Sequence, residues 1–414
     1  MLDIKYIREH IDEVEETAKR RGVKVDIEQL LKLDDQRRSL IARSDELRAT
    51  RNQGSKTKPT PEEIAKMRAL GDEVGKLEEE QGQVQAQYDA LLAMMPNLIH
   101  PDGPVGGEND FKLVDTIGEP PKFSFTPKDH ETLLVEQGLL DFERGAKVAG
   151  GKFYFAQGDL VRLNQALVNY GIDVVSKHGY TLVETPDMAK NEILQGIGFA
   201  PRGPETQVYS VEGTDLSLIG TAEITMGGYH AGEILDLSAG PKKYVALSHC
   251  FRTEAGAYGR ESKGLYRVHQ FTKLEMFVYC KPEESEKLHK ELLSIEREIV
   301  DGLGLPYRVI DTAAGDLGAP AYRKFDIEAW MVMKDGYGEI TSTSNCTDYQ
   351  ARRLGIRYRV AEGKTDYAHT LNGTAVVLSR FPIAIVENYQ NEDGSIRIPE
   401  VLRPYMGGRE VIRG

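Results

Sequence analysis

The sequence predicts an α+β protein in which two long N-terminal helices precede a larger domain built on a mostly antiparallel sheet. Residues 1–100 are rich in Glu, Lys, Arg, Gln, Leu and Ala and nearly free of β-branched runs, which favours helix. Residues 96–107, PNLIHPDGPVGG, are rich in proline and glycine and mark a linker. Beyond the linker, short strand-like runs alternate with two amphipathic helices. We therefore expect two domains, residues 1–100 and 101–414.

The composition is typical of an intracellular globular protein. The chain has 414 residues, enough for two domains, and its net charge of −13 gives no general attraction to nucleic acid. The three cysteines, Cys250, Cys280 and Cys346, match neither a disulfide framework nor a zinc pattern. The charged N-terminus does not read as a signal peptide, and no run of about 18 apolar residues could span a membrane. We expect a cytoplasmic protein with no membrane partner.

A heptad repeat in the N-terminal part predicts a helical hairpin. Leucine or valine recurs every seven residues in two separate stripes, as in helices that pack as a coiled coil. The stripes are Leu33, Leu40 and Leu47, and then Leu77, Val84 and Leu91. Between them, residues 52–61 contain one glycine and two prolines, and Thr60-Pro61-Glu62-Glu63 is typical of a helix start. The sequence predicts an antiparallel coiled-coil hairpin over residues 27–95.

Basic side chains are concentrated on the first helix of this hairpin and at its tip. Residues 36–58 hold seven of them, opposed within that stretch only by Asp45 and Glu46. The seven are Arg37, Arg38, Arg43, Arg48, Arg51, Lys56 and Lys58. Taken alone, such a run most often forms a solvated helix face. The alternative is a local positive surface that binds the phosphates of a nucleic acid.

The second part contains predicted helices over residues 159–178 and 282–303. Strands are predicted over residues 180–186, 244–247, 307–310, 329–333 and 375–378. Neither GxGxxG nor GxxxxGK[ST] occurs, so the sequence lacks the signatures of the usual nucleotide-binding folds. A mostly antiparallel sheet with helices beside it is the expected architecture.

The most informative segment spans residues 250–277, CFRTEAGAYGRESKGLYRVHQFTKLEMF. It predicts a strand ending near Glu254, a glycine-rich loop, and a second strand over residues 265–279. Arg252 and Arg267 flank the loop, and guanidinium groups placed in this way can clamp a polyphosphate with paired hydrogen bonds. An enzyme that activates a carboxylic acid with ATP needs such cations, because negative charge develops at the α-phosphorus.

This segment resembles motif 2 of the class II aminoacyl-tRNA synthetases, and its form FRTEAG…GLYRVHQFTKLE is similar to that of the bacterial seryl-tRNA synthetases. HTLNGT at 369–374, followed by Ser379 and Arg380, resembles motif 3, and residues 337–353, YGEITSTSNCTDYQARR, resemble the strand before it. The resemblance extends from the N-terminus to about Tyr405. It implies a class II antiparallel-sheet catalytic domain that activates L-serine with ATP. The seryl group would then pass to the 3′ end of tRNA(Ser), with tRNA(Sec) left open as a further acceptor.

The resemblance also implies an ATP site. Arg252 would hold the serine carboxylate against the α-phosphate, Glu254 would accept from the adenine amino group, and Arg267 would lie near the γ-phosphate. Phe271 and Arg380 would enclose the adenine from opposite faces. The full set is Arg252, Thr253, Glu254, Arg267, Val268, Phe271, Glu339, Ile340, Thr341, Ser342 and Arg380. Within it, Arg252, Glu254 and Arg380 are the expected catalytic residues. Glu339 and Ser342, expected where a strand passes into a turn, would bind Mg²⁺.

A serine pocket is implied by three further short segments. Glu223 would pair with the α-ammonium group, and Glu275 would accept a hydrogen bond from the serine hydroxyl. The full set is Thr221, Ala222, Glu223, Arg252, Glu275, Asn372 and Thr374. A small site that binds a hydroxyl group rejects alanine, because its buried acceptor would then lack a partner.

The remaining implications concern partners. The hairpin resembles the tRNA-binding arm of the family, and the region from the helix ending at His178 to Pro186 resembles its dimer element, so a homodimer is expected. Two alternatives are a ligase of the same fold that charges a carrier protein, and an inactive relative that acts as an RNA-binding or structural protein. Ligases of the first kind lack the helical arm, which this chain is predicted to have. An inactive relative would have lost residues such as Arg252 or Glu275, which this chain keeps.

Overall fold

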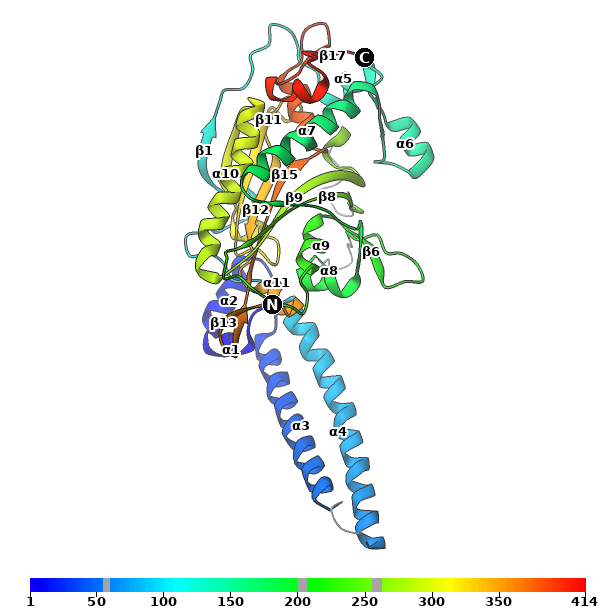
Figure 1. Cartoon of the computed structure of the whole chain (residues 1–414), viewed down its shortest axis with the longest axis vertical. Helices are drawn as coiled ribbons and strands as arrows, with labels where there is room; N and C mark the ends of the chain where they lie inside the picture. Colours follow the sequence, from blue (N-terminus) through cyan, green and yellow to red (C-terminus); the bar gives the residue numbers. More distant parts are fainter. Residues whose placement is uncertain (55–59, 200–206, 255–262) are drawn as a thin grey trace. The chain divides into compact units, whose positions relative to one another are not determined.

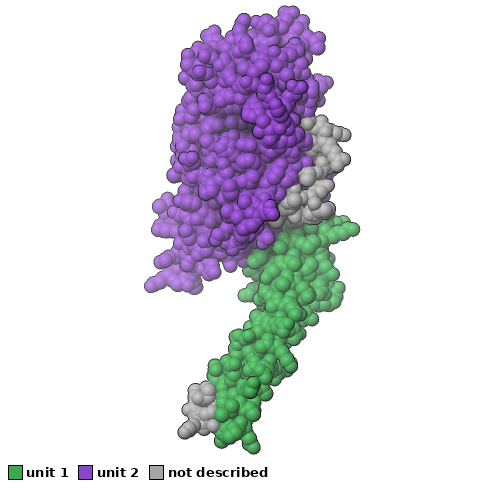
Figure 2. All heavy atoms as spheres, turned by 90° about the vertical axis from the view of Figure 1, so that its right-hand side faces the viewer, with its two compact units in different colours: residues 1–96 green, residues 97–414 purple. Residues whose placement is uncertain are grey.

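The computed structural model describes residues 1–54, 60–199, 207–254 and 263–414. The chain forms two compact units, Met1–Pro96 and Asn97–Gly414, which are shown in green and purple in Figure 2. The division falls inside the predicted linker, four residues before the expected boundary. Among the described residues, no helix has the length and apolar character needed to cross a membrane.

The first unit consists of helices. They are α1 (Ile4–Glu9), α2 (Ile11–Arg20), α3 (Ile27–Gly54) and α4 (Pro61–Met94). The long helices α3 and α4 pack side by side as a hairpin (Figure 1). Helix α4 begins where the sequence indicates: the Thr60 hydroxyl accepts from the Glu63 N–H, while the Glu63 carboxylate accepts from the Thr60 N–H. The predicted hairpin is confirmed, with α3 extending slightly into the predicted break.

The basic surface of the hairpin is smaller than the sequence predicts. Most of the arginines on α3 are paired with carboxylates, either on the same helix or on α4. The pairs are Arg37 and Arg38 with Asp34, Arg43 with Glu73, and Arg48 with Glu78. Lys56 and Lys58 lie outside the described residues. The pairs of Arg43 and Arg48 were missed because their partners lie 30 residues away along the chain, on the returning helix, and Asp34 was missed because it lies just before the basic stretch.

The second unit is built on an eight-stranded sheet in the order β1-β10-β11-β12-β15-β9-β8-β4. The strands are β1 (Lys112–Ile117), β4 (Thr181–Glu184), β8 (Lys242–Phe251), β9 (Gln270–Cys280), β10 (Tyr307–Asp311), β11 (Arg323–Met331), β12 (Gly336–Asn345) and β15 (His369–Val377). All neighbouring pairs are antiparallel except β4 with β8. The predicted α+β class with a mostly antiparallel sheet is confirmed.

Helices and small sheets surround this sheet. The helices are α5 (His130–Glu136), α6 (Phe142–Ala149), α7 (Gly158–Lys177), α8 (Asn191–Ile197), α9 (Ala222–Gly228), α10 (Ser285–Leu303), α11 (Tyr349–Leu354) and α12 (Phe381–Asn388). The smaller strands are β2 (Leu140–Asp141), β3 (Phe155–Ala156), β5 (Met188–Lys190), β6 (Leu216–Leu218), β7 (Ile234–Leu235), β13 (Arg357–Ala361), β14 (Lys364–Tyr367), β16 (Ile396–Arg397) and β17 (Val411–Ile412). The two predicted long helices correspond to α7 and α10.

The strand predicted from residue 265 begins later than expected. Gly264–Tyr266 form a turn of 3₁₀ helix, and β9 starts only at Gln270. The side chains of Leu265 and Tyr266 are buried, so their apolar character reflects packing rather than membership of the strand. Arg267 and Val268 therefore lie in the connection that leads into β9.

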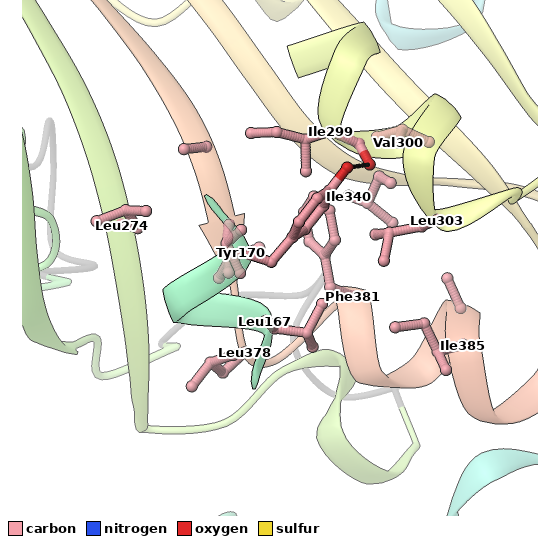
Figure 3. Packing of buried hydrophobic residues seen from close by; sticks show 14 of the residues in the cluster. Leu167, Tyr170, Leu274, Ile299, Val300, Leu303, Ile340, Leu378, Phe381 and Ile385 are labelled. Carbon is pink, nitrogen blue, oxygen red and sulfur yellow. Dashed lines mark hydrogen bonds between the residues drawn. The ribbon is translucent and has the colours of Figure 1, made fainter. Parts of the chain in front are cut away.

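The core of the second unit lies between the sheet and the helices α7, α10 and α12. Leu167 and Tyr170 of α7 pack near Ile299 and Leu303 of α10 and Phe381 of α12 (Figure 3). The Tyr170 hydroxyl donates to the Ile299 carbonyl at 3.3 Å, which satisfies the polar end of a largely buried ring. This packing fixes the strands that carry the site described below.

One buried carboxyl group of α10 lies against β15 without a hydrogen-bond partner. Glu296 is fully buried, and among the described residues neither of its side-chain oxygens has a partner. A Cβ atom at Gly373 would lie 2.8 Å from its Oε1, so glycine is what leaves room for this side chain. Burial, and then the charge of Glu275, raises the pKa of Glu296 well above its usual value. This shift favours the neutral, protonated form of Glu296.

We predict that Glu296→Met stabilises the protein by about 1–3 kcal/mol, because it removes unpartnered polar atoms while keeping the length of the side chain. Urea unfolding at several pH values measures the effect. The folded protein retains a proton that the unfolded chain releases above about pH 4 to 5, so wild-type stability falls as pH rises.

The advantage of Glu296→Met should therefore widen from pH 5 to pH 8. Glu296→Gln is the matched control, since it cannot ionise but keeps polar atoms. Compared with wild type, Glu296→Gln should lack the decrease in stability with rising pH, but it should not gain the stability that comes from removing polar atoms. A methionine variant less stable than wild type at every pH would contradict this account of Glu296.

Candidate functional site

Two adjoining hollows lie where β12, β15, β9 and β8 run next to one another in the sheet (Figure 1). The first hollow has a volume of about 110 Å³ and the second about 370 Å³. Every predicted ATP ligand except Thr253 lines the first hollow. Every predicted serine ligand except Ala222, which is fully buried, lines the second. Arg252, Lys273, Ser342 and Thr374 line both, so the two hollows have a common wall.

Arg252 follows the last residue of β8 and reaches into this common wall. Its Nε donates to the Gly220 carbonyl at 3.2 Å, and its guanidinium carbon lies 5.3 Å from the centre of the Phe271 ring. Phe199, at 5.9 Å, flanks it as well. The side chain is thus held by a hydrogen bond and two rings while it lines both hollows. Such a cation can contact anions in both.

Glu254 and Arg267 lie on opposite sides of the undescribed loop and form an ion pair of 3.1 Å. Glu254 has a φ of 47°, in the left-handed region that non-glycine residues rarely adopt. Strained backbone of this kind is common at functional sites. The Thr253 N–H donates to the Gln207 carbonyl at 3.2 Å, which accounts for the position of Thr253 beside the hollow rather than in its lining.

The two residues expected to enclose a purine lie in the first hollow, but Arg380 packs on a different ring. Its guanidinium carbon is 3.5 Å from the centre of the Tyr266 ring, and Lys334 lies 4.0 Å from the same centre. The Arg380 Nη1 also donates to the Glu339 carbonyl at 3.3 Å. Phe271 instead faces Arg252. Tyr266 is thus a lining residue that the sequence did not reveal.

A β-bulge places Glu339 and Ser342 in the same hollow. Residues three apart on a regular strand point to opposite faces. In the register of β11 with β12, Ile327 lies opposite Thr341 and Glu328 lies opposite Glu339, so Ile340 is an extra residue. The prediction that a strand passes into a turn here was wrong, because β12 continues to Asn345. The bulge, not a turn, brings the two side chains into the same hollow.

The electrostatics of the first hollow keep Glu339 ionised. Burial disfavours the charged form, but the positive charges of Lys324 and Arg380 outweigh it and hold the pKa of Glu339 below its usual value. A carboxylate and a hydroxyl on one side of a bulged strand are hard oxygen donors, which suit Mg²⁺. Among the described residues, no three His, Cys, Asp or Glu side chains gather in a metal-binding group. The donor set therefore fits an ion that takes its other ligands from a substrate and water.

Glu223 lies at the start of α9, in the lining of the second hollow. The helix is capped by Thr221, whose hydroxyl accepts from the Glu223 N–H. The Glu223 Oε1 accepts from Gln350 Nε2 at 2.7 Å and from Asn372 Nδ2 at 3.0 Å. Burial, and then the charge of Glu275, raises the pKa of Glu223 to about 7. This carboxyl group is therefore held in place while its charge remains sensitive to pH.

Glu275 lies opposite Thr374 across the β9–β15 pair. Its side chain is almost fully buried, and Oε2 accepts from the Thr374 hydroxyl at 3.3 Å and from the Lys273 ammonium group. Lys273 also lies within 3.5 Å of the Thr374 hydroxyl. The floor of the second hollow is therefore a buried ion pair with a hydroxyl group beside it.

Sequence reasoning missed Lys273, Tyr266, Phe199 and Gln350. For Lys273 a signal was present, since residues 271, 273 and 275 alternate along one strand and so share a face with two predicted site residues. For Phe199 and Gln350, no local pattern indicates the site. Phe199 reaches it from the segment that follows α8, and Gln350 reaches it from α11, both through the tertiary fold.

Comparison with known families and structures accounts for the whole chain. The model of the "tRNA synthetase class II core domain (G, H, P, S and T)" matches residues 208–389, and that of the "Seryl-tRNA synthetase N-terminal domain" matches residues 1–99. The serine–tRNA ligase of Treponema denticola is 52% identical over 98% of this chain and 99% of its own length. That of Rubrobacter xylanophilus is 50% identical over 100% and 99%.

Solved structures agree. The crystal structure of the Pyrococcus horikoshii seryl-tRNA synthetase complexed with ATP matches with a TM-score of 0.90 and 39% identity, covering 100% of this chain and 99% of that one. The cytoplasmic enzyme of Naegleria fowleri in complex with AMP gives 0.85 and 34%, with the same coverage. With full-length relatives at half identity and the same fold throughout, the chain belongs to the seryl-tRNA synthetase family of class II aminoacyl-tRNA synthetases.

Proposed function

We propose that the first hollow binds ATP, that the second binds L-serine, and that the two substrates react across their common wall. The observation that carries this proposal is that Arg252, Lys273, Ser342 and Thr374 line both hollows. Two reactants held on either side of one wall meet in a fixed orientation, which is the main requirement of a reaction between a carboxylate and a phosphate. The reaction needs no protein nucleophile.

In the first step, a serine carboxylate oxygen attacks the α-phosphorus, and pyrophosphate leaves. Arg252 lies where one guanidinium group can contact both the carboxylate and the α-phosphate, and its rigid support limits reorganisation. Arg267 binds the outer phosphates, and Glu254 binds the adenine amino group. The ion pair that these two side chains form in this structure therefore opens when the nucleotide binds. Val268 lines the same hollow, and the backbone of Thr253 lies beside it.

The adenine lies between Phe271 and Arg380 in this proposal. Because Arg380 packs on Tyr266 here, that ring provides a platform which keeps the guanidinium group at the rim of the hollow. Arg380 then has only to shift toward the adenine face. The catalytic residues remain Arg252, Glu254 and Arg380, each placed to contact a substrate.

Glu339 and Ser342 are the proposed Mg²⁺ ligands, and Ile340 at the bulge and Thr341 after it complete this part of the lining. A bound Mg²⁺ neutralises phosphate charge. The protein contributes in two ways. The neighbouring cations keep Glu339 ionised, and the bulge directs the Glu339 carboxylate and the Ser342 hydroxyl into the same hollow.

Serine is bound in the second hollow by three polar contacts. Glu223 pairs with the ammonium group, Arg252 with the carboxylate, and Glu275 accepts from the hydroxyl. Thr221, Ala222, Asn372 and Thr374 support these contacts, since Asn372 donates to Glu223 and Thr374 donates to Glu275. Alanine cannot provide the hydroxyl donor, and the extra methyl group of threonine would press on this polar floor.

In the second step, the seryl group passes to the 3′-terminal ribose of a tRNA. The proposal assigns the α3–α4 hairpin to binding of tRNA(Ser), supported by the match of residues 1–99 to the family's N-terminal domain. Because most arginines on α3 are paired, this binding depends on shape and on a few free cations more than on bulk charge. tRNA(Sec) is proposed as a second acceptor by resemblance alone.

The proposal includes a cytoplasmic homodimer. The strand β4 forms an edge of the sheet, and its Leu182 is 50% exposed, while Val161 of α7 is 37% exposed. This is the region whose sequence resembles the family's dimer element. The three cysteines are buried free thiols, which suits a reducing compartment.

The most direct test is serine-dependent ATP–pyrophosphate exchange by wild type and Arg252→Ala. We predict a loss of at least about a hundredfold in the variant, the scale on which removal of one preorganised donor acts. Arg359→Ala, which removes an exposed arginine of β13, is the matched control and should retain wild-type exchange. Near-normal exchange by Arg252→Ala would contradict the assignment.

The pKa of Glu223 predicts a pH dependence. Since Glu223 must be ionised to pair with the serine ammonium group, and its pKa is raised to about 7, kcat/KM for serine should fall as pH drops below 7. The limiting slope is about tenfold per pH unit. The profile for ATP should lack this step, and Glu223→Gln should abolish it while raising KM for serine. An unchanged step in Glu223→Gln would assign the titration to another group.

Shortening the hairpin should separate the two steps. Replacing residues 42–79 by a short turn of about three residues keeps the buried base of the unit, including Leu33 and Tyr88. We predict serine-dependent exchange within about twofold of wild type and a loss of about a hundredfold or more in tRNA charging, since the phosphate contacts are removed. Thermal unfolding checks that the base remains folded. Normal charging by this variant would exclude the hairpin as the tRNA-binding arm.

A further inference from the structure

Lys273 is the charged residue of the common wall to which the family resemblance assigned no role. It lies in the middle of β9, and its side chain is only 10% exposed. Its ammonium group donates to Glu275 Oε2 and lies 3.5 Å from the Thr374 hydroxyl. A lysine so deeply buried requires a partner, and Glu275 is that partner.

The groups around Lys273 come from several elements. Besides Glu275 on the same strand, the carboxylates of Glu223 on α9 and Glu339 on β12 influence the site, and Arg252 after β8 supplies a second cation. The Cys250 thiol of β8 is also near. Behind the sheet, Glu296 is neutral and supplies no charge. Among the described residues, Lys273 is the one cation in ion-pair contact with Glu275.

We propose that Lys273 is a positioning residue for substrate selection: its ammonium group holds the buried Glu275 carboxylate in the orientation that accepts the substrate hydroxyl. This inference rests on the proposed function and adds to it a residue that sets the discrimination between serine and alanine. Lys273 acts through Glu275 and has no separate contact with the amino acid.

The chemical reason is that an ionised carboxylate only accepts hydrogen bonds. Serine satisfies Glu275 with its hydroxyl, whereas alanine leaves a buried charge without that donor, which is costly. Without Lys273, the almost fully buried Glu275 would lose the cation that fixes its Oε2. The acceptor would no longer be held toward the substrate hydroxyl, so discrimination would fall even though Glu275 is still present.

The test is pyrophosphate exchange with serine and with alanine by wild type and Lys273→Met. We predict that Lys273→Met raises KM for serine about tenfold and lowers the serine-to-alanine ratio of kcat/KM by about tenfold or more, with KM for ATP within about twofold. A merely structural role would lower activity with both amino acids alike and would leave this ratio unchanged.

A double-mutant cycle with Glu275→Gln shows whether Lys273 acts through Glu275. The double variant should discriminate no worse than Glu275→Gln alone. Lys287→Met, an exposed lysine of α10, is the control and should behave as wild type. Lys273→Gln repeats the test if the apolar side chain prevents folding.

Additive losses in the cycle, or a fall in kcat with an unchanged serine-to-alanine ratio, would overturn the proposal and place the cation at the reacting phosphate. These results differ from failure of the proposed function, in which wild type itself shows no serine-dependent exchange.

Discussion

The pairing of β9 with β15 is the constraint on which the site depends. It places Glu275 opposite Thr374, and the same strands bring Lys273 and Asn372 into the two hollows. Because side chains alternate along a strand, a shift of one residue in this register would turn Glu275 away from Thr374 and toward the other face. Packing of α7 and α10 on the sheet holds this register. The buried core therefore also fixes the positions of the side chains that line the two hollows.

Four glutamate carboxyl groups lie in or behind this region, and each has a different environment. Glu223 is held by two amide groups and titrates near pH 7. Glu275 is paired with a lysine, Glu339 is kept ionised by nearby cations, and Glu296 is neutral behind the sheet. Environment thus gives one functional group four different settings, three of which suit the proposed roles of ammonium partner, hydroxyl acceptor and metal ligand, while the fourth is that of a core side chain.

The sequence predicts much of this fold because the signals are local. The heptad leucines and the Thr60–Glu63 cap define the hairpin, and alternating β-branched residues identify most central strands. The motif residues identify most of the lining of the first hollow but fewer than half of the residues that line the second. What the sequence does not reveal depends on partners distant in the chain. The bulge at Ile340 is visible only in the register with β11, and the pairs of Arg43 and Arg48 with glutamates only once α4 returns beside α3. The packing of Arg380 on Tyr266 likewise has no signal in the sequence.

The central claim is that the two hollows form one continuous site with a common wall. Competition binding with a non-hydrolysable seryl-adenylate analogue, which carries both substrate groups in one molecule, tests it most directly. The account predicts that the analogue displaces both ATP and serine and binds at least about a hundredfold more tightly than either, as expected for a ligand that resembles the reaction intermediate. An analogue that competes with only one substrate, or binds no better than ATP, would contradict it.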